Sequence, residues 1–474
     1  MNSRLGLAVL IHTLFSTCSH YHATVLTSLE PFVQEFCNQS LQERFNIRLN
    51  SVQWAWLWGG ITSSMSIGCL LGSCLMSSVI TRFGRRNSVM VVKNLLLFLS
   101  SIMQFSARPF GLIELLIIGR FIMGLSHVFT LFTPILVTEC APVAYRGRAS
   151  TLLVVGFRAW LTAGPMMALP WTLGTNQRWH WVMLVPCVPV VLHLLAARFI
   201  PKSPKHLYIL HNDVKGAVAA IKWYHGKKVN VQQVLEEYEK EAKLTAGRQP
   251  GLKNIMQTRH LRWVFSICLC LWTAIPLAGV SIVFAYSTPV MRTLEISQSQ
   301  GALFTACALQ LPGILTSLVS AYLIEKCGRR VVHLSGYAVI ITGLCLLVLA
   351  GIIKGALGSV LSVLAMSMVM NGHTFGTTLA FMLPGEICPT AIKANTVSVC
   401  QAVCWCLIIL TVFSFPSMLQ LVGCYALIPF ICASATIWVF LFFYFPETKG
   451  KSVAEIVSRW CDDEKELSDC KTRC

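Results

Sequence analysis

The apolar residues of this chain gather into twelve long runs that are separated by polar stretches. Each run reaches roughly the 20 residues that a helix needs to cross a bilayer. The runs fall at residues 5–28, 54–80, 89–106, 112–138, 149–169, 181–200, 263–286, 301–324, 333–353, 359–383, 395–415 and 425–445. This pattern predicts an all-α membrane protein with twelve transmembrane helices.

Two polar stretches interrupt the spacing of the runs. Residues 30–52 are predicted to be a polar loop, and they contain an N-glycosylation sequon that begins at Asn38. Residues 201–262 are strongly basic, and within them residues 217–224 and 231–244 read as amphipathic surface helices. We therefore expect two six-helix halves, a linker and a tail. The predicted units are residues 1–200, 201–262, 263–445 and 446–474.

The first and second runs carry features that bear on packing. Residues 1–15 resemble a signal peptide, but the run continues to Leu29 without a small-residue cleavage site, so we expect it to remain attached. Its polar residues, which recur at helical spacing, are Thr13, Thr17, His20, Thr24 and Thr27. Such a stripe faces a bundle interior or a water-filled cavity. In the second run Gly68 and Gly72 lie four apart and predict a smooth face for close helix packing.

An internal duplication supports two similar halves. Three features occur twice in the same order, about 245 positions apart. They are Gly84-Arg85-Arg86 with Gly328-Arg329-Arg330, Glu139 and Arg146 with Glu386 and Lys393, and Pro201-Lys202-Ser203-Pro204-Lys205 with Pro446-Glu447-Thr448-Lys449. Chance could supply one match but is a poor account of three. Each Gly-Arg-Arg motif is predicted to be a tight, positively charged turn between two helices.

Composition agrees with a membrane protein. Hydrophobic residues make up 55% of the 474 positions and charged residues only 12%, with a mean hydropathy of +0.64, whereas soluble domains carry about 25% charged residues. The net charge of +18 does not indicate nucleic acid, because the basic residues lie in loops and form no aromatic-basic surface. Most of the 20 cysteines lie in apolar runs and should pack as small hydrophobes. No metal site and no cofactor are predicted.

The distribution of Lys and Arg predicts the topology. When the twelve runs are threaded in order, both Gly-Arg-Arg turns and the linker lie on the same side of the membrane. That side carries the basic excess, so the positive-inside rule makes it cytoplasmic. Both termini are then cytoplasmic, and Asn38 lies outside, where it could carry a glycan.

Two duplicated six-helix halves joined by a cytoplasmic linker are typical of the major facilitator fold. The chain resembles the sugar porter family, the facilitative hexose transporters, over essentially its whole length. The matching residues are Arg82-Phe83-Gly84-Arg85-Arg86, Gly119-Arg120-Phe121, Glu139 with Arg146-Gly147, Glu325 with Gly328-Arg329-Arg330, Glu386, and Pro446-Glu447-Thr448-Lys449-Gly450. The resemblance implies a plasma-membrane carrier of a small-molecule solute such as glucose or fructose. No enzymatic activity is expected.

The resemblance also implies a charge network at the cytoplasmic helix ends. Its candidate residues are Arg85, Arg86, Glu139, Arg146, Glu325, Arg329, Arg330, Glu386 and Lys393. Ion pairs among them would hold the outward-open state and break when the carrier opens inward. The alternative is that these residues only anchor helix ends and set the orientation of the chain.

The candidate solute site departs from the family pattern. The substrate-binding candidates are Ser281, Tyr286, Phe381, Trp405, His373 and Arg158. Where the family has two glutamines on the seventh run, this chain has Ile275 and Pro276, and the expected asparagines fall at Gly313 and Cys404. Few hydrogen-bonding groups remain for a sugar, although each unpaired buried hydroxyl costs about 1–3 kcal/mol.

Three functions therefore stay open. They are passive uniport of a hexose, transport of another solute that is less hydroxylated or anionic, and nutrient sensing without transport. Uniport is expected over proton symport, because His22 occupies the position of the Asp that sugar–proton symporters of this fold carry in the first helix. Histidine has an unperturbed pKa near 6.5, so proton coupling through His22 is the alternative.

Arg158 lies at the centre of the fifth run, too deep to reach the membrane surface easily. Exposure to lipid would cost at least about 2.5–3.5 kcal/mol, so we expect Arg158 to face a cavity or a partner. The runs at residues 5–28, 263–286, 301–324, 359–383 and 395–415 contain no Asp or Glu. Arg158 is then either a cavity-lining residue solvated by water or a residue that favours an anionic or strongly hydrogen-bonding solute, unless the helix boundary is misplaced.

Overall fold

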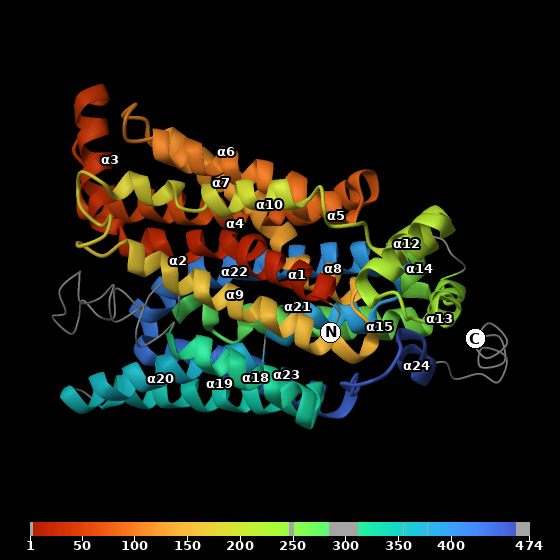
Figure 1. Cartoon of the computed structure of the whole chain (residues 1–474). Helices are drawn as coiled ribbons and strands as arrows, with labels where there is room; N and C mark the ends of the chain where they lie inside the picture. Colours follow the sequence, from red (N-terminus) through yellow and green to blue (C-terminus); the bar gives the residue numbers. More distant parts are fainter. Residues whose placement is uncertain (1–2, 246–250, 284–310, 354, 377, 461–474) are drawn as a thin grey trace.

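A computed structural model describes residues 3–245, 251–283, 311–353, 355–376 and 378–460, and these residues contain helices and connecting turns but no strand (Figure 1). The long helices lie side by side, so that their ends form two opposite ends of the molecule. The short helices α12, α13 and α14 lie at one end with α24, and α3 lies at the other. We call the former the linker end. The predicted all-α fold is confirmed.

The helices follow the predicted runs in chain order. Helices before residue 201 are α1 Ser3–Ile11, α2 Tyr21–Ser28, α3 Glu30–Phe45, α4 Ser51–Phe83, α5 Arg85–Asn87, α6 Lys93–Ser106, α7 Ile113–Leu131, α8 Thr133–Cys140, α9 Arg146–Met167 and α10 Cys187–Ala196. Those of the linker are α11 Pro204–His211, α12 Val214–His225, α13 Val231–Lys243 and α14 Leu252–Gln257. Later helices are α15 Arg259–Leu277, α18 Leu311–Cys327, α19 Arg329–Ile352, α20 Ala356–Phe375, α21 Thr378–Ile387, α22 Thr390–Val422, α23 Ile428–Tyr444 and α24 Val453–Val457. The two predicted linker helices are thus confirmed as α12 and α13, whereas α11 and α14 were not predicted.

Eight helical stretches of the described residues are long and apolar enough to cross a membrane. They are Val52–Phe83, Arg85–Ser106, Ile113–Cys140, Trp179–Ala196, Arg259–Val283, Arg329–Ile352, Thr390–Leu419 and Gly423–Tyr444. The other four predicted runs are the first, fifth, eighth and tenth. The first run is broken, the fifth carries Arg158 at its centre, the eighth is described only from Leu311, and the tenth is divided between α20 and α21.

The first run leaves the α-helical form between α1 and α2. A π-helical turn covers His12–Ser16 and a 3-10 turn covers Thr17–His20. Lys93 of α6 donates from Nζ to the Ser16 carbonyl oxygen at 2.8 Å and lies 3.2 Å from the Ser16 hydroxyl. A buried ammonium group therefore binds a carbonyl in the irregular segment. Interruptions of this kind are frequent at functional sites.

The prediction of a polar loop at residues 30–52 is wrong, because most of this stretch is the helix α3. Its buried side chains Val33, Phe36, Cys37 and Ser40 recur at helical spacing. Asn46 ends the helix in the left-handed conformation with φ of 56°. The short apolar stripe is outnumbered by polar residues on the exposed face, which is why composition alone suggested a loop.

Helices α4 and α7 pack with their backbones in close contact, as the glycine spacing predicts. A methyl group on Gly68 would overlap the Phe121 carbonyl oxygen, and one on Gly124 would overlap the Met65 carbonyl oxygen. A methyl group on Gly72 would lie 3.1 Å from the Leu125 Cα atom. Small residues permit this approach and allow van der Waals packing inside the membrane.

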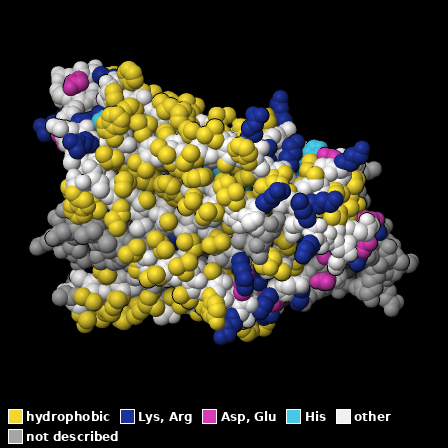
Figure 2. All heavy atoms as spheres, viewed as in Figure 1, with side chains coloured by type: hydrophobic (Ala, Val, Ile, Leu, Met, Phe, Trp, Pro, Cys, Tyr) yellow, Lys and Arg dark blue, Asp and Glu magenta, His cyan; other side chains and the backbone are white. Residues whose placement is uncertain are grey.

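The surface is apolar along the length of the bundle and basic at the linker end. Figure 2 shows hydrophobic side chains over the middle of the visible face and many Lys and Arg side chains around the linker helices. Large apolar side chains point outward from the long helices, including Leu95, Leu99, Leu195 and Phe443. Polar groups such as Lys93, Asn94 and His193 are buried instead. This apolar exterior suits contact with lipid.

The helices before and after the linker meet along three pairs. Helix α4 packs against α22, α9 against α18, and α8 against α21. In the first pair Ser398 donates to the Ser73 carbonyl oxygen, and Ser77 donates to Asn395 Oδ1. These polar contacts connect the two sets of helices at the linker-side half of α4.

Candidate functional site

A buried carboxylate at the linker end binds cations from both sets of helices. Glu139, at the end of α8, forms ion pairs with Arg85 of α5 and with Lys393 of α22, the latter at 3.0 Å. Ser203, just before α11, donates to the second carboxylate oxygen at 3.3 Å. The side chains of Glu139 and Lys393 are both 0% exposed. We call Glu139, Arg85, Lys393 and Ser203 the Glu139 cluster.

A second carboxylate cluster repeats this arrangement among the later helices. Glu386 of α21 pairs with Arg329 of α19 at 3.2 Å, and Thr448 donates to its other oxygen at 2.6 Å. Glu447 accepts from the backbone N–H groups of Arg329 and Arg330 at 2.9 and 3.1 Å, so it caps the first turn of α19. We call Glu386, Arg329 and Thr448 the Glu386 cluster.

The duplicated motifs of the sequence therefore meet in space twice. Each Gly-Arg-Arg turn supplies an arginine, and each Pro-containing motif supplies a hydroxyl. The carboxylates are those of Glu139 and Glu386, which occupy equivalent positions in the duplication. The two clusters differ in how they connect the two sets of helices. Lys393 crosses to Glu139, whereas its counterpart Arg146 donates from Nε to the Ala141 carbonyl oxygen at 3.2 Å. The Arg329 guanidinium lies next to Gly147 of α9, but its ion pair is with Glu386, which belongs to the same set of helices as Arg329.

The other candidate network residues lie at the same end with different partners. Glu325 of α18 pairs with Arg148 of α9 across the two sets of helices, and this pair is largely exposed. Arg330 donates to the Phe442 carbonyl oxygen. Arg86 donates to Asn87 Oδ1 at 3.2 Å. The structure thus brings Glu139, Arg85 and Lys393 together, whereas in the described part of the chain the side chains of Arg86 and Arg330 form no ion pair with Glu139 or Glu386.

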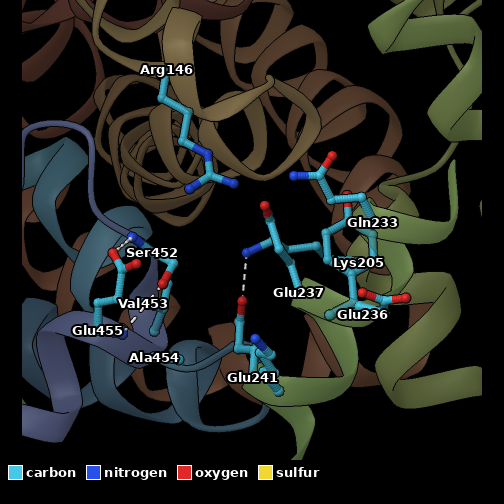
Figure 3. Close-up of a pocket in the computed structure, with 12 residues that line it drawn as sticks. Arg146, Lys205, Gln233, Glu236, Glu237, Glu241, Ser452, Val453, Ala454 and Glu455 are labelled. Carbon is cyan, nitrogen blue, oxygen red and sulfur yellow. Dashed lines mark hydrogen bonds and ion pairs between the residues drawn. The ribbon is translucent and has the colours of Figure 1, made fainter. Parts of the chain in front are cut away.

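A cavity of about 310 Å³ opens beside these clusters, and Arg146 points into it (Figure 3). Its walls come from α9, α11, α13 and the turn that leads into α24. Lys205 and Glu241 form an ion pair on one wall, and both side chains are buried. Glu241 also accepts from the backbone N–H of Thr390 at 2.8 Å, so the linker is fastened to the start of α22.

The charges around Glu241 explain why its carboxyl group is ionised. Burial alone would raise the pKa of Glu241, but Lys205 and Lys393, together with hydrogen bonds from Lys205 and Thr390, outweigh burial and lower the pKa to about 2. Burial lowers the pKa of Lys205 to about 8, although Glu241 partly offsets this effect. The pair is ionised at neutral pH. Neither residue was assigned a role from the sequence.

The candidate substrate-binding residues lie deep in the bundle. Arg158 of α9 and His373 of α20 are buried and within electrostatic range of each other. Trp405 of α22 has its ring centroid 5.9 Å from that of His127 on α7. His127 was not predicted as a site residue, although it interrupts an apolar run.

Phe381 and Ser281 lie on the side of the later helices. The Phe381 ring packs edge-on against Trp272 of α15 at 5.2 Å. Ser281 is partly buried in the helical stretch that follows α15 and Gly279. Tyr286 lies outside the described residues. The structure therefore groups Arg158, His373 and Trp405 at the meeting of the two sets of helices, while Phe381 packs on α15.

Polar residues also fill the interior between the first run and α6. His22 is buried, its carbonyl oxygen accepts from Arg120 at 2.9 Å, and its Nε2 lies 3.4 Å from the Ser101 hydroxyl. His193 contacts His12 and Asn94 at 3.2 and 2.9 Å. Among the described residues, no group of three or more His, Cys, Asp or Glu is arranged to hold a metal ion.

Asn38 lies on α3 at the end opposite to the linker. It is partly buried, and its side-chain oxygen accepts from the Leu49 N–H at 3.4 Å. Ser40 of the sequon donates to the Gly111 carbonyl oxygen at 2.5 Å. A groove of about 690 Å³ adjoins Asn38 on this face.

Comparison with solved structures defines the class of protein. The chain superimposes on the major facilitator superfamily proton:xylose symporter XylE bound to 6-bromo-6-deoxy-D-glucose with a TM-score of 0.81 at 20% identity, over 97% of this chain and 99% of that one. An inward-open conformation of XylE from E. coli gives a TM-score of 0.64 at 19% identity, over 96% of this chain and 100% of the other. The fold is therefore the twelve-helix major facilitator fold of a multi-pass membrane protein.

Sequence comparison identifies the family within this class. The model of the family described as "Sugar (and other) transporter" matches residues 8–460, and the chain belongs to this family of transporters, not to an enzyme family. It is 26% identical over 458 residues to the facilitated glucose transporter member 3 of solute carrier family 2 from Ovis aries, covering 95% of this chain and 91% of the relative. The Gallus gallus protein of the same description is 28% identical over 459 residues, covering 94% and 90%.

Proposed function

We propose that the chain carries a hexose such as glucose or fructose across the plasma membrane by alternating access, as a uniporter. The observation that carries this proposal is the Glu139 cluster, in which one buried carboxylate is bound by cations from both sets of helices. Relatives described as facilitated glucose transporters support a hexose as the solute. The moving units are residues 1–200 and 263–445, joined by residues 201–262 and followed by the tail, residues 446–474.

The linker end is the cytoplasmic end in this proposal, and both termini are cytoplasmic. The basic side chains around the linker helices support this orientation through the positive-inside rule (Figure 2). Asn38 lies at the opposite end and would face outward. The cytoplasmic path is closed when α5, α8 and α22 are held together at the Glu139 cluster.

Opening toward the cytoplasm requires these inter-helix contacts to break. Lys393 would withdraw from Glu139, and Arg148 would withdraw from Glu325, as the two halves separate. The Arg85–Glu139 and Arg329–Glu386 pairs lie within one half each. They would move with their halves and keep the carboxylates ionised while the crossing pairs form and break.

Uptake by the purified full chain in proteoliposomes tests the proposal. Saturable uptake of labelled D-glucose or D-fructose, driven only by its own gradient, is the expected result. Binding of these sugars without any flux would support the nutrient-sensor alternative. Saturable flux of an organic anion with no flux of either hexose would support the second alternative.

Charge reversal at three residues of the linker end should slow transport. Arg329→Glu, Glu386→Lys and Arg146→Glu each alter a residue at the contact between the halves, so we expect hexose uptake to fall roughly tenfold, the effect of about 1.4 kcal/mol, at near-normal surface abundance. Glu239→Lys, an exposed change on α13, is the matched control and should leave uptake unchanged. Loss of folded protein in all three charge-reversal variants would instead favour a purely structural role.

Proton coupling through His22 should be absent. His22 is buried, its ring lies 3.4 Å from the Ser101 hydroxyl, and none of the ion pairs in the described part of the chain includes His22, so sugar uptake is not expected to move protons. Sugar addition should leave the external pH constant, as measured with a pH electrode on dense vesicles. Sugar-driven alkalinisation that disappears in His22→Ala would contradict uniport.

Glycosylation at Asn38 follows from the proposed orientation. The protein expressed in animal cells should gain mobility on a gel after glycosidase treatment, and Asn38→Gln should abolish this shift. Ser40→Thr retains the sequon and is the matched control, which should keep the shift. A shift that persists in Asn38→Gln would exclude Asn38 as the attachment site.

A further inference from the structure

Arg158 is a buried cation at the meeting of the two sets of helices. The residue is 0% exposed. Its Nη2 donates to the Met370 carbonyl oxygen of α20 at 3.2 Å, and its guanidinium lies 5.5 Å from the ring centroid of Phe157. In the described part of the chain, none of the ion pairs includes Arg158. A guanidinium cannot lose its proton in a protein, so this site holds a positive charge without a carboxylate.

Several buried donors at the contact between the two sets of helices have no hydrogen-bond partner among the described residues. Within the described ranges, the Nε and Nη1 atoms of Arg158, the indole N–H of Trp405 and the Gln401 side-chain nitrogen have no hydrogen-bond partner. A chain of ring contacts connects Arg158 to Trp405 through Phe157, His20 and His127, with centroid distances of 4.0, 4.7 and 5.9 Å between successive rings. Such buried donors are costly unless a ligand satisfies them.

The arginine side chain uses space left by a missing amide. Gly313 of α18 stands where the sugar porter pattern has an asparagine, and a methyl group built on Gly313 would lie 3.2 Å from Arg158 Cδ. A larger side chain at residue 313 would compete with the guanidinium for this space. An asparagine side chain in this space could both donate and accept hydrogen bonds. The Arg158 guanidinium that lies beside Gly313 is a cation that can only donate.

We infer that the solute carried by this protein bears a carboxylate that binds Arg158, as a sugar acid would. The inference rests on the proposed transport by alternating access, and it narrows the solute from hexoses in general to hexoses that carry a carboxylate. A carboxylate supplies acceptors only and one negative charge, which matches one guanidinium and its neighbouring donors. A neutral hexose supplies hydroxyl groups that also need acceptors, and Ile275, Pro276 and Cys404 have replaced the amides that would provide them.

The test compares D-glucuronate with D-glucose, which differ at C6, as labelled solutes for the full chain in proteoliposomes. We expect saturable D-glucuronate uptake that exceeds D-glucose uptake at equal concentration. Arg158→Gln should lower D-glucuronate uptake by roughly 10- to 100-fold, the effect of losing one hydrogen bond to a charged group. D-glucose uptake should stay constant or rise, and Arg158→Lys, which retains the charge, should keep part of the preference.

Three other outcomes would overturn either the inference or the proposed function. D-glucose uptake with neither uptake of nor competition by D-glucuronate would overturn the inference and leave the proposed hexose transport intact. Equal loss of both activities in Arg158→Gln, with normal thermal stability, would also overturn it, because the residue would then not distinguish the solutes. Absence of flux and of binding for both solutes would overturn the proposed function itself.

Discussion

Replacing Glu139 by Gln should destabilise the protein by about 3–5 kcal/mol, the usual cost of removing one partner from a buried ion pair. The substitution keeps the size of the side chain but removes the charge that balances Arg85 and Lys393, which are 1% and 0% exposed. Both cations would remain buried without a counter-charge. Thermal unfolding of the detergent-solubilised protein, together with hexose uptake, would measure the effect.

Two comparisons separate loss of charge balance from a general effect of substitution. Glu114→Gln removes an exposed carboxylate that pairs with Arg44, and it should change stability by at most about 1 kcal/mol. Adding Lys393→Met to Glu139→Gln removes one of the unbalanced cations and should recover part of the loss. Equal stability of Glu139→Gln and wild type would show that the cluster contributes no net stabilisation.

Replacing Gly68 by Ala should also destabilise the protein, because it prevents α4 and α7 from packing with their backbones in contact. The added methyl group would overlap the Phe121 carbonyl oxygen, and because the obstacle is backbone the two helices must separate. Overpacking of this kind typically costs about 1–3 kcal/mol and occasionally more. We expect a lower melting temperature and little protein at the cell surface.

The same helix provides a control with the opposite expected sign. Gly60 lies in α4 and has no neighbouring atom within 4 Å of an added methyl group. Gly60→Ala should therefore stabilise the helix by about 0.5–1 kcal/mol through higher helix propensity. Equal effects of Gly60→Ala and Gly68→Ala would contradict close packing of α4 and α7.

Several parts of the fold could be predicted because the membrane leaves few alternatives. Long apolar runs must be helical in lipid, since backbone polar groups have no water to bind. Charges that recur beside those runs, such as Glu139 and Glu386, need partners, and the resemblance to the sugar porters implied that they form a network. The Gly68 and Gly72 spacing similarly indicated a close helix contact, and in the structure the partner is α7.

Other features depend on tertiary contacts that carry no periodic signal. The break in the first run involves the Lys93 ammonium group, which comes from another helix. Helix α3 has only a narrow apolar stripe in a polar stretch. The sequence also placed Arg146 with the carboxylates, whereas its Nε donates to the Ala141 carbonyl oxygen. Such differences arise from geometry at the helix ends, where one turn decides which partner a long side chain reaches.

The two ion pairs that cross between the halves differ in their access to water, and this difference affects how dissolved salt acts on the protein. Arg148 and Glu325 are 64% and 25% exposed, so mobile ions, with a screening length of about 8 Å at physiological ionic strength, can weaken their attraction. Lys393 and Glu139 are shielded from those ions. Ionic strength should therefore adjust the outer contact while the inner contact keeps its strength, so that in the proposed transport cycle the electrolyte at the linker end would alter the rate of opening without abolishing the closed state.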